Sequence, residues 1–284
     1  MAPLPFDDRP GEIWLDGAFV PWREAKVHIL THALHYASSV FEGARAYDGK
    51  IFKLEQHTKR LLSSSAMLDL KVPFTEQELN MAQSELVRRQ GHKDAYVRPV
   101  VWRGSAMMSV GAPNSDIHVG IASWPWPAYF DAEARRKGIR LEVSKWRRPA
   151  PDCAPWQAKA SGLYMICTLS RHTAERNGYN DAMMLDYRGQ IAEGTGANIF
   201  FVKSGALHTP IADCFLDGIT RQTIIELAAA RQIKVHERTI FPAELPEFEE
   251  CFLCGTAVEV TPVGEIAGQM FHPGKITQMM AGDY

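Results

Sequence analysis

Two charged residues stand in surroundings that suit catalysis. Lys159 lies among the small residues of Lys-Ala-Ser-Gly-Leu-Tyr (159–164), and Glu193 precedes a Gly-Thr-Gly turn. A lysine withdrawn from water can form Schiff bases with carbonyl compounds, and a carboxylate beside a basic ring nitrogen keeps that ring protonated. Most lysines and turn glutamates are nevertheless solvated surface charges. Spacing alone leaves both interpretations open.

Four blocks of the sequence favour the catalytic interpretation. They are residues 32–47 (His-Ala-Leu-His-Tyr-Ala-Ser-Ser-Val-Phe-Glu-Gly-Ala-Arg-Ala-Tyr), 159–164, 193–200 (Glu-Gly-Thr-Gly-Ala-Asn-Ile-Phe) and 255–263 (Gly-Thr-Ala-Val-Glu-Val-Thr-Pro-Val). In this order, and over nearly the whole chain, the blocks resemble the fold-type IV pyridoxal phosphate enzymes. Within that group the chain is most similar to the branched-chain amino acid aminotransferases.

The resemblance implies a fold and a reaction. The fold would be α+β, with the two-domain architecture of proteins like D-amino acid aminotransferase. The reaction would be the ping-pong transfer of an amino group from L-leucine, L-isoleucine or L-valine to 2-oxoglutarate, with pyridoxal 5'-phosphate as the cofactor. Lys159 would be the catalytic residue, which holds the cofactor as an aldimine and, once released, moves the substrate proton.

The resemblance also implies which residues bind the cofactor. Glu193 matches the family residue that faces the pyridine nitrogen, and Tyr164 matches the one that hydrogen-bonds the ring oxygen. The phosphate group needs a positive charge, hydroxyl groups and backbone N–H groups such as those at the start of a helix. We expect these donors from Arg60, Gly218, Ile219, Thr220 and Thr256.

The substrate pocket is expected mostly from the first half of the chain. Alternation along a strand places Phe41, Gly43 and Arg45 on one face, and it does the same for Tyr96 and Arg98. By resemblance, Met108 and Val110 belong to a loop that reaches into the neighbouring subunit, which implies a homodimer or a larger assembly such as a hexamer. The remaining pocket residues implied by the resemblance are Tyr36, Trp126, Tyr129, Thr256 and Ala257.

Two positions depart from the family pattern. Relatives usually carry Asn where this chain has Leu163 and Glu where it has Ala197. The chain also ends sooner than typical relatives, so the substrate range is more open than the reaction type. The alternatives are a D-amino acid or R-amine transaminase, an aminodeoxychorismate lyase of the same fold, and a relative that binds the cofactor without catalysis.

Composition narrows the class of protein further. The chain has 284 residues, enough for two domains, and a net charge of −2, which gives no reason to expect nucleic acid or an anionic membrane as partner. It contains neither a membrane-spanning apolar run nor the pattern of a signal peptide. The five cysteines are scattered, as expected for reduced cytoplasmic thiols, and Cys251-x-x-Cys254 lies in a strand-like run that favours buried thiols over a metal site. We therefore expect no metal.

The elements that must position these residues follow from turns and periodicity. Asp16-Gly17 and Asp48-Gly49 are hairpin turn signals, and Thr75-Glu76-Gln77-Glu78 is a capping box before a helix. Prolines 125 and 127 mark a stiff connector. We expect a smaller domain over residues 1–123, a linker over 124–135 and a larger domain over 136–284. The expected helices are 55–68, 76–90, 162–177 and 221–231, the last capped by Thr220. The expected strands are 12–15, 18–20, 41–47, 51–54, 95–102, 117–123, 182–185, 198–202, 207–209, 251–254 and 258–260.

Overall fold

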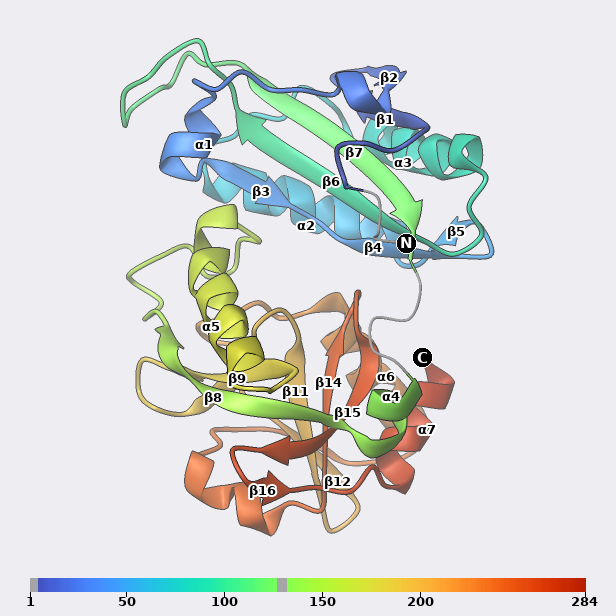
Figure 1. Cartoon of the computed structure of the whole chain (residues 1–284), viewed down its shortest axis with the longest axis vertical. Coiled ribbons are helices and arrows are strands. Elements are labelled where there is room, and N and C mark those ends of the chain that lie inside the picture. Colours follow the sequence, from blue (N-terminus) through green and yellow to red (C-terminus); the bar gives the residue numbers. More distant parts are fainter. Residues whose placement is uncertain (1–4, 127–131) are drawn as a thin grey trace. The chain divides into compact units, whose positions relative to one another are not determined.

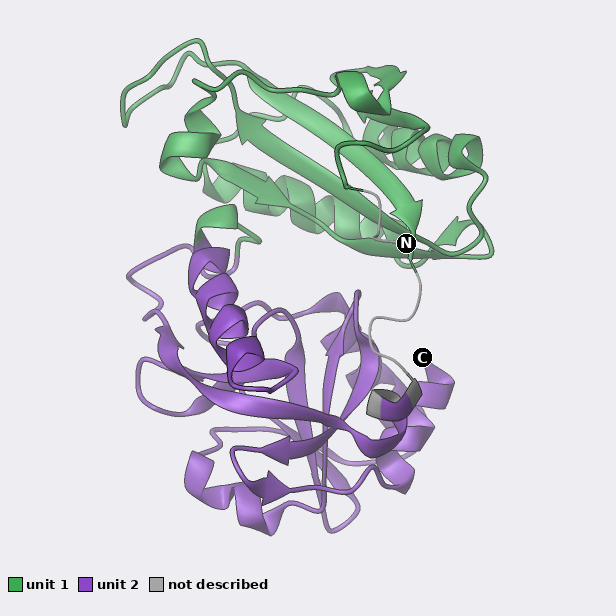
Figure 2. Cartoon of the chain, viewed as in Figure 1, with its two compact units in different colours: residues 1–127, 158–162 green, residues 128–157, 163–284 purple. Residues whose placement is uncertain are grey.

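The computed structural model describes residues 5–126 and 132–284 (Figure 1). The chain divides into two compact units (Figure 2). Unit 1 comprises Met1–Pro127 together with Ala158–Gly162, and unit 2 comprises Ala128–Gln157 and Leu163–Tyr284. The expected boundaries differ from these units because the short segment around Lys159 leaves unit 2 and joins unit 1.

Main-chain contacts explain why this segment belongs to unit 1. Val40 and Ala160 form an antiparallel bridge, and the Phe41 N–H donates to the carbonyl oxygen of Lys159 at 3.1 Å. The Lys159 N–H in turn donates to the Ser64 hydroxyl at 3.0 Å. The segment therefore continues the edge of the unit 1 sheet.

Among the described residues, unit 1 forms a seven-stranded sheet in the order β2-β1-β7-β6-β4-β5, with β3 also pairing β6. Every pairing in this sheet is antiparallel. Asp16 and Gly17 of the first hairpin have φ of 47° and 98°, and the Asp48-Gly49 turn is similar, as two-residue hairpin loops require. The strands are β1 (Glu12–Leu15), β2 (Ala18–Pro21), β3 (Ser39–Phe41), β4 (Ala44–Tyr47), β5 (Lys50–Ile51), β6 (Ala95–Arg103) and β7 (Ile117–Pro125).

Two helices, α2 (Leu54–Met67) and α3 (Glu76–Gln90), pack on one face of this sheet (Figure 1). The predicted capping box is present, because Thr75 accepts from the Glu78 N–H while the Glu78 carboxylate accepts from the Thr75 N–H. The opposite face is approached by the segment that holds η1 (Trp22–Glu24) and α1 (His32–Tyr36).

Pro99 explains an unexpected break in the sheet. The expected strand 41–47 is observed as β3 and β4, and both keep one continuous register against β6, with Phe41 opposite Val100 and Ala44 opposite Val97. Between them the Glu42 N–H donates to the carbonyl oxygen of Pro99 at 2.9 Å. Proline has no N–H to return, so the ladder is interrupted while the alternation of side chains is preserved.

Unit 2 holds a nine-stranded mixed sheet, counted over the described residues, in the order β10-β9-β8-β15-β14-β11-β12-β13 with β16 beside β15. Its strands are β8 (Ile139–Arg148), β9 (Asp181–Asp186), β10 (Ile191–Gly194), β11 (Asn198–Lys203), β12 (Ala206–Thr209), β13 (Val235–Glu237), β14 (Glu250–Gly255), β15 (Glu259–Ile266) and β16 (Gln269–Met270). Its helices are α4 (Ala132–Lys137), α5 (Met165–Arg176), α6 (Ile219–Ala230), η3 (Pro242–Glu247) and α7 (Lys275–Asp283), whereas the short helix η2 (Ser161–Tyr164) begins in unit 1 and ends in unit 2. No helix among the described residues is long and apolar enough to cross a membrane.

The core of unit 2 lies on both sides of β14. Cys251 packs into one apolar cluster with Phe201 and Leu253, whereas Cys254 packs into another with Phe200 and Phe252. Both thiols are fully buried, and burial raises the pKa of each. The two cysteines therefore behave as core residues on opposite faces of a strand.

Several expected boundaries were wrong for local reasons. The predicted linker begins inside β7, because Trp124 and Pro125 pair with Tyr96 and Ala95 of β6. The predicted strand 51–54 ends at Ile51, since Leu54 already starts α2. Thr220 does not cap α6, because the helix begins at Ile219, two residues earlier than expected, with Gly218 as its N-cap.

Gly138 provides a test of the packing between α4 and β15. Its φ is 86°, and a Cβ there would stand 2.4 Å from the backbone nitrogen of Gly264. We expect Gly138→Ala to lower the free energy of unfolding by more than ~3 kcal/mol in urea denaturation. The control is Gly178→Ala, which has a φ of 81° and no atom within 4 Å, and should lose only ~1–2 kcal/mol. Equal losses in the two variants would contradict the close approach.

Candidate active site

Lys159 lies at the edge of the unit 1 sheet, half-buried as a residue and with its amine withdrawn from water. Its side-chain nitrogen is 5.1 Å from the centre of the Phe41 ring. Burial lowers the pKa of Lys159 to about 8, and the nearby positive charge of Arg60 acts in the same direction. A larger fraction of the amine is therefore neutral near pH 8 than at an exposed lysine, and the neutral amine is the nucleophilic form.

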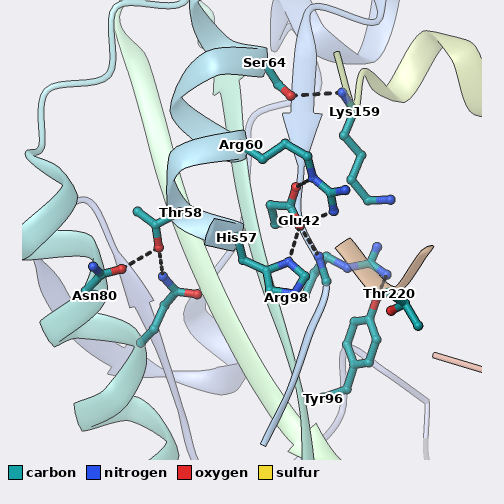
Figure 3. A network of polar contacts seen from close by, with 12 residues as sticks. Glu42, His57, Thr58, Arg60, Ser64, Asn80, Tyr96, Arg98, Lys159 and Thr220 are labelled. Carbon is teal, nitrogen blue, oxygen red and sulfur yellow. Dashed lines mark hydrogen bonds and ion pairs between the residues drawn. The ribbon is translucent and has the colours of Figure 1, made fainter. Parts of the chain in front are cut away.

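A buried carboxylate, Glu42, organises the charges beside Lys159 (Figure 3). It accepts from Arg60 Nε at 2.5 Å and Arg60 Nη2 at 2.9 Å, and His57 Nδ1 lies 2.8 Å away. Burial would raise the pKa of Glu42, but Arg60 and His57 outweigh it and hold that pKa well below the usual range. Burial lowers the pKa of His57. Glu42 therefore balances the charge of Arg60 and fixes the direction of its guanidinium group.

Sequence reasoning missed Glu42 and His57, although a signal for both was present. Phe41 and Gly43 were placed on one face of their strand, so Glu42 had to point to the other face, where α2 packs. His57 and Arg60 are three residues apart on that helix and share one side of it.

A second set of polar contacts connects α2 to α3, because Thr58 donates to Asn80 at 2.5 Å and Gln83 donates to Thr58 at 2.9 Å (Figure 3).

The residues predicted to contact substrate gather on the sheet face opposite α2. Cross-strand pairing sets Arg45 against Tyr96 and, in the same register, Gly43 against Arg98. A Cβ at Gly43 would stand 1.8 Å from the Tyr96 hydroxyl, so only glycine leaves room for that ring. Arg98 Nη2 donates to the Tyr96 hydroxyl at 3.1 Å, and its guanidinium group lies 4.7 Å from the Phe41 ring centre.

Aromatic rings border the same group. The Tyr96 ring lies 4.9 Å from that of Trp126 and 5.2 Å from that of Trp124. Tyr36, at the end of α1, is 43 % exposed. Met108 and Val110 lie on the loop between β6 and β7 and are also exposed. Tyr129, the remaining predicted pocket residue, lies outside the described residues.

In unit 2 the predicted pyridine partner, Glu193, is buried beside a second arginine. Arg148 Nε lies 3.3 Å from Glu193 Oε1, and both side chains are at most 10 % exposed. Burial would lower the pKa of Arg148, but Glu193 raises it overall. Arg148 also donates to the carbonyl oxygen of Leu163 at 3.2 Å. Sequence reasoning missed Arg148, which no motif distinguishes from a surface charge.

The predicted phosphate donors of unit 2 lie at the start of α6. Gly218 is the N-cap and offers no side chain to the first turn, so the N–H groups of that turn point toward the helix end without a side-chain cap. Asn198 fixes this turn, because it donates to the Leu216 carbonyl oxygen at 3.0 Å and accepts from the Gly218 N–H at 3.2 Å. The Thr220 hydroxyl lies 3.5 Å from that of Tyr284.

The other predicted residues of unit 2 lie at element ends. Tyr164 ends η2 and immediately precedes α5. Thr256 and Ala257 form the turn between β14 and β15. Of the two departures from the family pattern, Leu163 is half-buried, whereas Ala197 is buried in the unit 2 core.

One cluster in unit 2 has the composition of a metal site. Among the described residues, ligand atoms of Asp186, Asp213 and Cys214 lie within 4.8 Å of one another. Arg188, however, forms ion pairs with both aspartates, at 2.7 and 2.8 Å. The two carboxylates are thus already neutralised, and the cluster gives no reason to assign a metal.

Comparison with known proteins identifies the class. The sequence profile of the family described as amino-transferase class IV matches residues 39–266. The chain therefore belongs to the class IV aminotransferases, and the α+β fold agrees with the sequence-based prediction.

Individual relatives carry a more specific name. A probable branched-chain-amino-acid aminotransferase of Rickettsia bellii is 44 % identical over 277 residues, which is 96 % of this chain and 94 % of the relative. A branched-chain aminotransferase from Thermoproteus uzoniensis, solved with norvaline, has a TM-score of 0.92 and 39 % identity, covering 96 % of this chain and 93 % of its own. The branched-chain amino acid aminotransferase from Thermobaculum terrenum, solved in its PLP-form, has a TM-score of 0.87 and 32 % identity, covering 97 % and 92 %.

The desolvated amine provides a test of the site in the cofactor-free protein. Because the folded pKa of Lys159, about 8, is below its ordinary 10.5, the unfolded chain binds more protons between these values, and stability rises with pH there. Lys159→Met removes this cost. At pH 7 the variant should be more stable by on the order of 3 kcal/mol, and the difference should shrink as the pH rises from 8 to 10.5.

Urea denaturation at several pH values measures this difference. The exposed Lys71→Met variant is the control and should track the wild type throughout. Parallel curves for the wild type and Lys159→Met would contradict a desolvated amine.

Proposed function

We propose that the protein is a branched-chain-amino-acid aminotransferase that uses pyridoxal 5'-phosphate to move an amino group from L-leucine, L-isoleucine or L-valine to 2-oxoglutarate. The observation that carries the proposal is the desolvated amine of Lys159, whose pKa is lowered to about 8 beside the Glu42–Arg60 pair. The names of the relatives, at 40–44 % identity over most of their length, support this substrate class.

The residues fit the cofactor in charge and in donor type. An uncapped helix start with a threonine hydroxyl suits a phosphate group, and the largely buried guanidinium group of Arg60 suits it further. Pyridoxal phosphate, when bound, supplies an aldehyde that takes up the amino group and a ring that accepts electrons. Glu193, paired with Arg148 at 3.3 Å, would face the ring nitrogen and hold a proton there, and Tyr164 would orient the ring.

Lys159 performs the proton transfer. Near pH 8 a larger fraction of its amine is neutral than at an exposed lysine, and the neutral amine can take the proton from the substrate α-carbon. Tyr96 of unit 1 is a candidate partner of the α-carboxylate, and so, in unit 2, are the residues of the Thr256–Ala257 turn. Phe41 forms an apolar wall for the branched side chain, and Gly43 leaves the space that this side chain and the Tyr96 ring require.

A panel of amino donors tests the proposal against its alternatives. L-Leucine, D-alanine and R-phenylethylamine are each incubated with 2-oxoglutarate and the cofactor, and glutamate and the keto products are measured. We expect turnover with L-leucine at least ~100-fold above the other two. Preference for D-alanine or the amine would assign the protein to the other transaminases, and pyruvate release from aminodeoxychorismate would assign it to the lyases.

We further propose a homodimer or larger assembly in the cytoplasm. The face of the unit 1 sheet away from α2 and α3 has a cavity of about 350 Å³, lined by Ile13, Leu15, Val27, Leu34, Val100 and Ala122 among others. Around it Ile29 is 72 % and Leu34 60 % exposed. A second copy of the chain would bury this apolar surface together with Met108 and Val110. Sedimentation of a monomer that retains full activity would refute the assembly.

The same pocket must accept the apolar side chain of leucine and the charged side chain of glutamate, and Arg98 can make both possible. Leucine brings an apolar side chain, whereas glutamate brings a carboxylate that needs a partner when buried. Arg98 Nε has no hydrogen-bond partner among the described residues, although its guanidinium group is tethered to Tyr96. We place the distal carboxylate of glutamate at Arg98.

Arg98→Ala should impair the half-reaction with glutamate by ~2–5 kcal/mol, because a buried carboxylate then lacks its partner. The half-reaction with leucine should fall much less. Single-turnover absorbance of the cofactor follows each half-reaction separately, and Arg23→Ala, which removes an exposed arginine, is the control. If both half-reactions fall equally, Arg98 serves the shared α-carboxylate or the fold instead.

A further inference from the structure

The loop that carries Met108 and Val110 is long and mostly exposed. It joins β6 to β7, and its base closes where the Gly104 N–H donates to the Asp116 carbonyl oxygen at 2.8 Å. Val110 is 81 % exposed and Met108 is 40 % exposed. In Figure 1 the connection between β6 and β7 extends away from the ends of both strands. Such a loop can hold a fixed shape only if other residues restrain its backbone.

His32 supplies one restraint. It is only 3 % exposed, and its Nε2 lies 2.8 Å from the Ser109 carbonyl oxygen. A carbonyl oxygen only accepts, so Nε2 carries the proton, and in the neutral ring Nδ1 then accepts from the Ser38 hydroxyl at 2.7 Å. The partners on both sides therefore fix the tautomer and the orientation of the ring.

The same imidazole also contacts Tyr36. The two ring centres are 4.6 Å apart, and Tyr36 is one of the residues expected to border the substrate. His32 thus joins an exposed tyrosine of α1 to the backbone between Met108 and Val110. The buried side chain of His32 therefore fixes the relative positions of three exposed residues that are expected to contact substrate, namely Tyr36, Met108 and Val110.

Arg103, the last residue of β6, supplies the second restraint, which acts near the far end of the loop. Its Nη1 donates to the Ala112 carbonyl oxygen at 2.7 Å and its Nη2 donates to the Asp69 carbonyl oxygen at 2.9 Å. Ala112 is itself buried. The loop is therefore attached at positions 109 and 112 to a buried histidine and a buried arginine, while the segment before and between them stays mostly exposed.

We propose that His32 is a positioning residue for substrate recognition, which aligns the β6–β7 loop with Tyr36 before substrate arrives. This inference rests on the proposed function and on the proposed assembly, because it assigns the loop, which would reach the neighbouring subunit, to the wall around the branched side chain. His32 itself does not touch the substrate. Its loss should weaken substrate binding while the proton transfer at Lys159 proceeds normally.

A matched pair of variants tests the role. His32→Phe keeps a ring against Tyr36 but removes both polar contacts, whereas His32→Gln retains an N–H that can reach the Ser109 carbonyl oxygen. For His32→Phe we expect a roughly tenfold higher KM for L-leucine with kcat within about twofold, as the loss of one such hydrogen bond implies. His32→Gln should restore most of the KM. His35→Phe, which loses only a contact to the Ile29 carbonyl oxygen, is the control.

Hydrogen exchange of the cofactor-free protein gives a readout independent of activity. Amides of residues 104–116 should exchange roughly tenfold faster in His32→Phe than in the wild type or His32→Gln. If His32→Phe does not fold, Ser38→Ala removes the partner of Nδ1 and should give the same changes at smaller size. An active wild type whose His32→Phe variant has an unchanged leucine KM, or a loop with unchanged exchange, overturns the positioning role. An inactive wild type overturns the proposed function instead.

Discussion

The candidate site depends on keeping the Lys159 amine out of water. A buried ammonium group is costly, so folding lowers the pKa of Lys159 and shifts its equilibrium toward the neutral amine. Arg60 pushes the pKa of Lys159 in the same direction, and Glu42 opposes it. Removing Glu42 would leave a largely buried arginine without its counter-charge, which is among the costliest single changes in a protein interior. The Glu42–Arg60 pair therefore lets a guanidinium group and the buried amine of Lys159 lie in one small region of unit 1.

Unit 2 solves a similar problem with a similar pair. Glu193 and Arg148 are both buried, and each compensates the charge of the other. In both units a charge expected to act on the cofactor is paired with an opposite charge from another part of the chain. Arg60 of α2 is paired with Glu42, and Glu193 of β10 is paired with Arg148 at the end of β8. Buried ion pairs contribute little net stability. The two pairs instead fix the orientation of the charged groups, because a paired guanidinium or carboxylate group has few orientations left.

Local turn chemistry and the family motifs carried most of the sequence-based prediction. Asp16-Gly17, Asp48-Gly49 and the Thr75–Glu78 capping box depend on residues within four positions of each other, so the sequence displays them directly. The start of α6 at Gly218 was harder, because an N-cap without a side chain looks like ordinary loop. Strand β8 was missed, since its Ser144–Arg148 end is rich in polar residues and its pairing with β9 and β15 is decided far along the chain. Arg148 was missed for the same reason. Glu42 was predictable in principle, because strand alternation that places Phe41 and Gly43 on one face points Glu42 to the other.

Residues 158–162 belong to unit 1 although they follow β8 of unit 2 in the sequence, and this order matters for folding during synthesis. All seven described strands of the unit 1 sheet are complete by residue 125, yet the edge at Val40 receives its last partner only at Ala160. On the ribosome, the N-terminal unit can therefore assemble its sheet long before Lys159 is synthesised. That lysine arrives after part of the next unit has already been synthesised, including the whole of β8. The sheet of unit 1 is thus synthesised before the candidate catalytic lysine, and an isolated fragment that ends after β7 would contain the sheet but not Lys159.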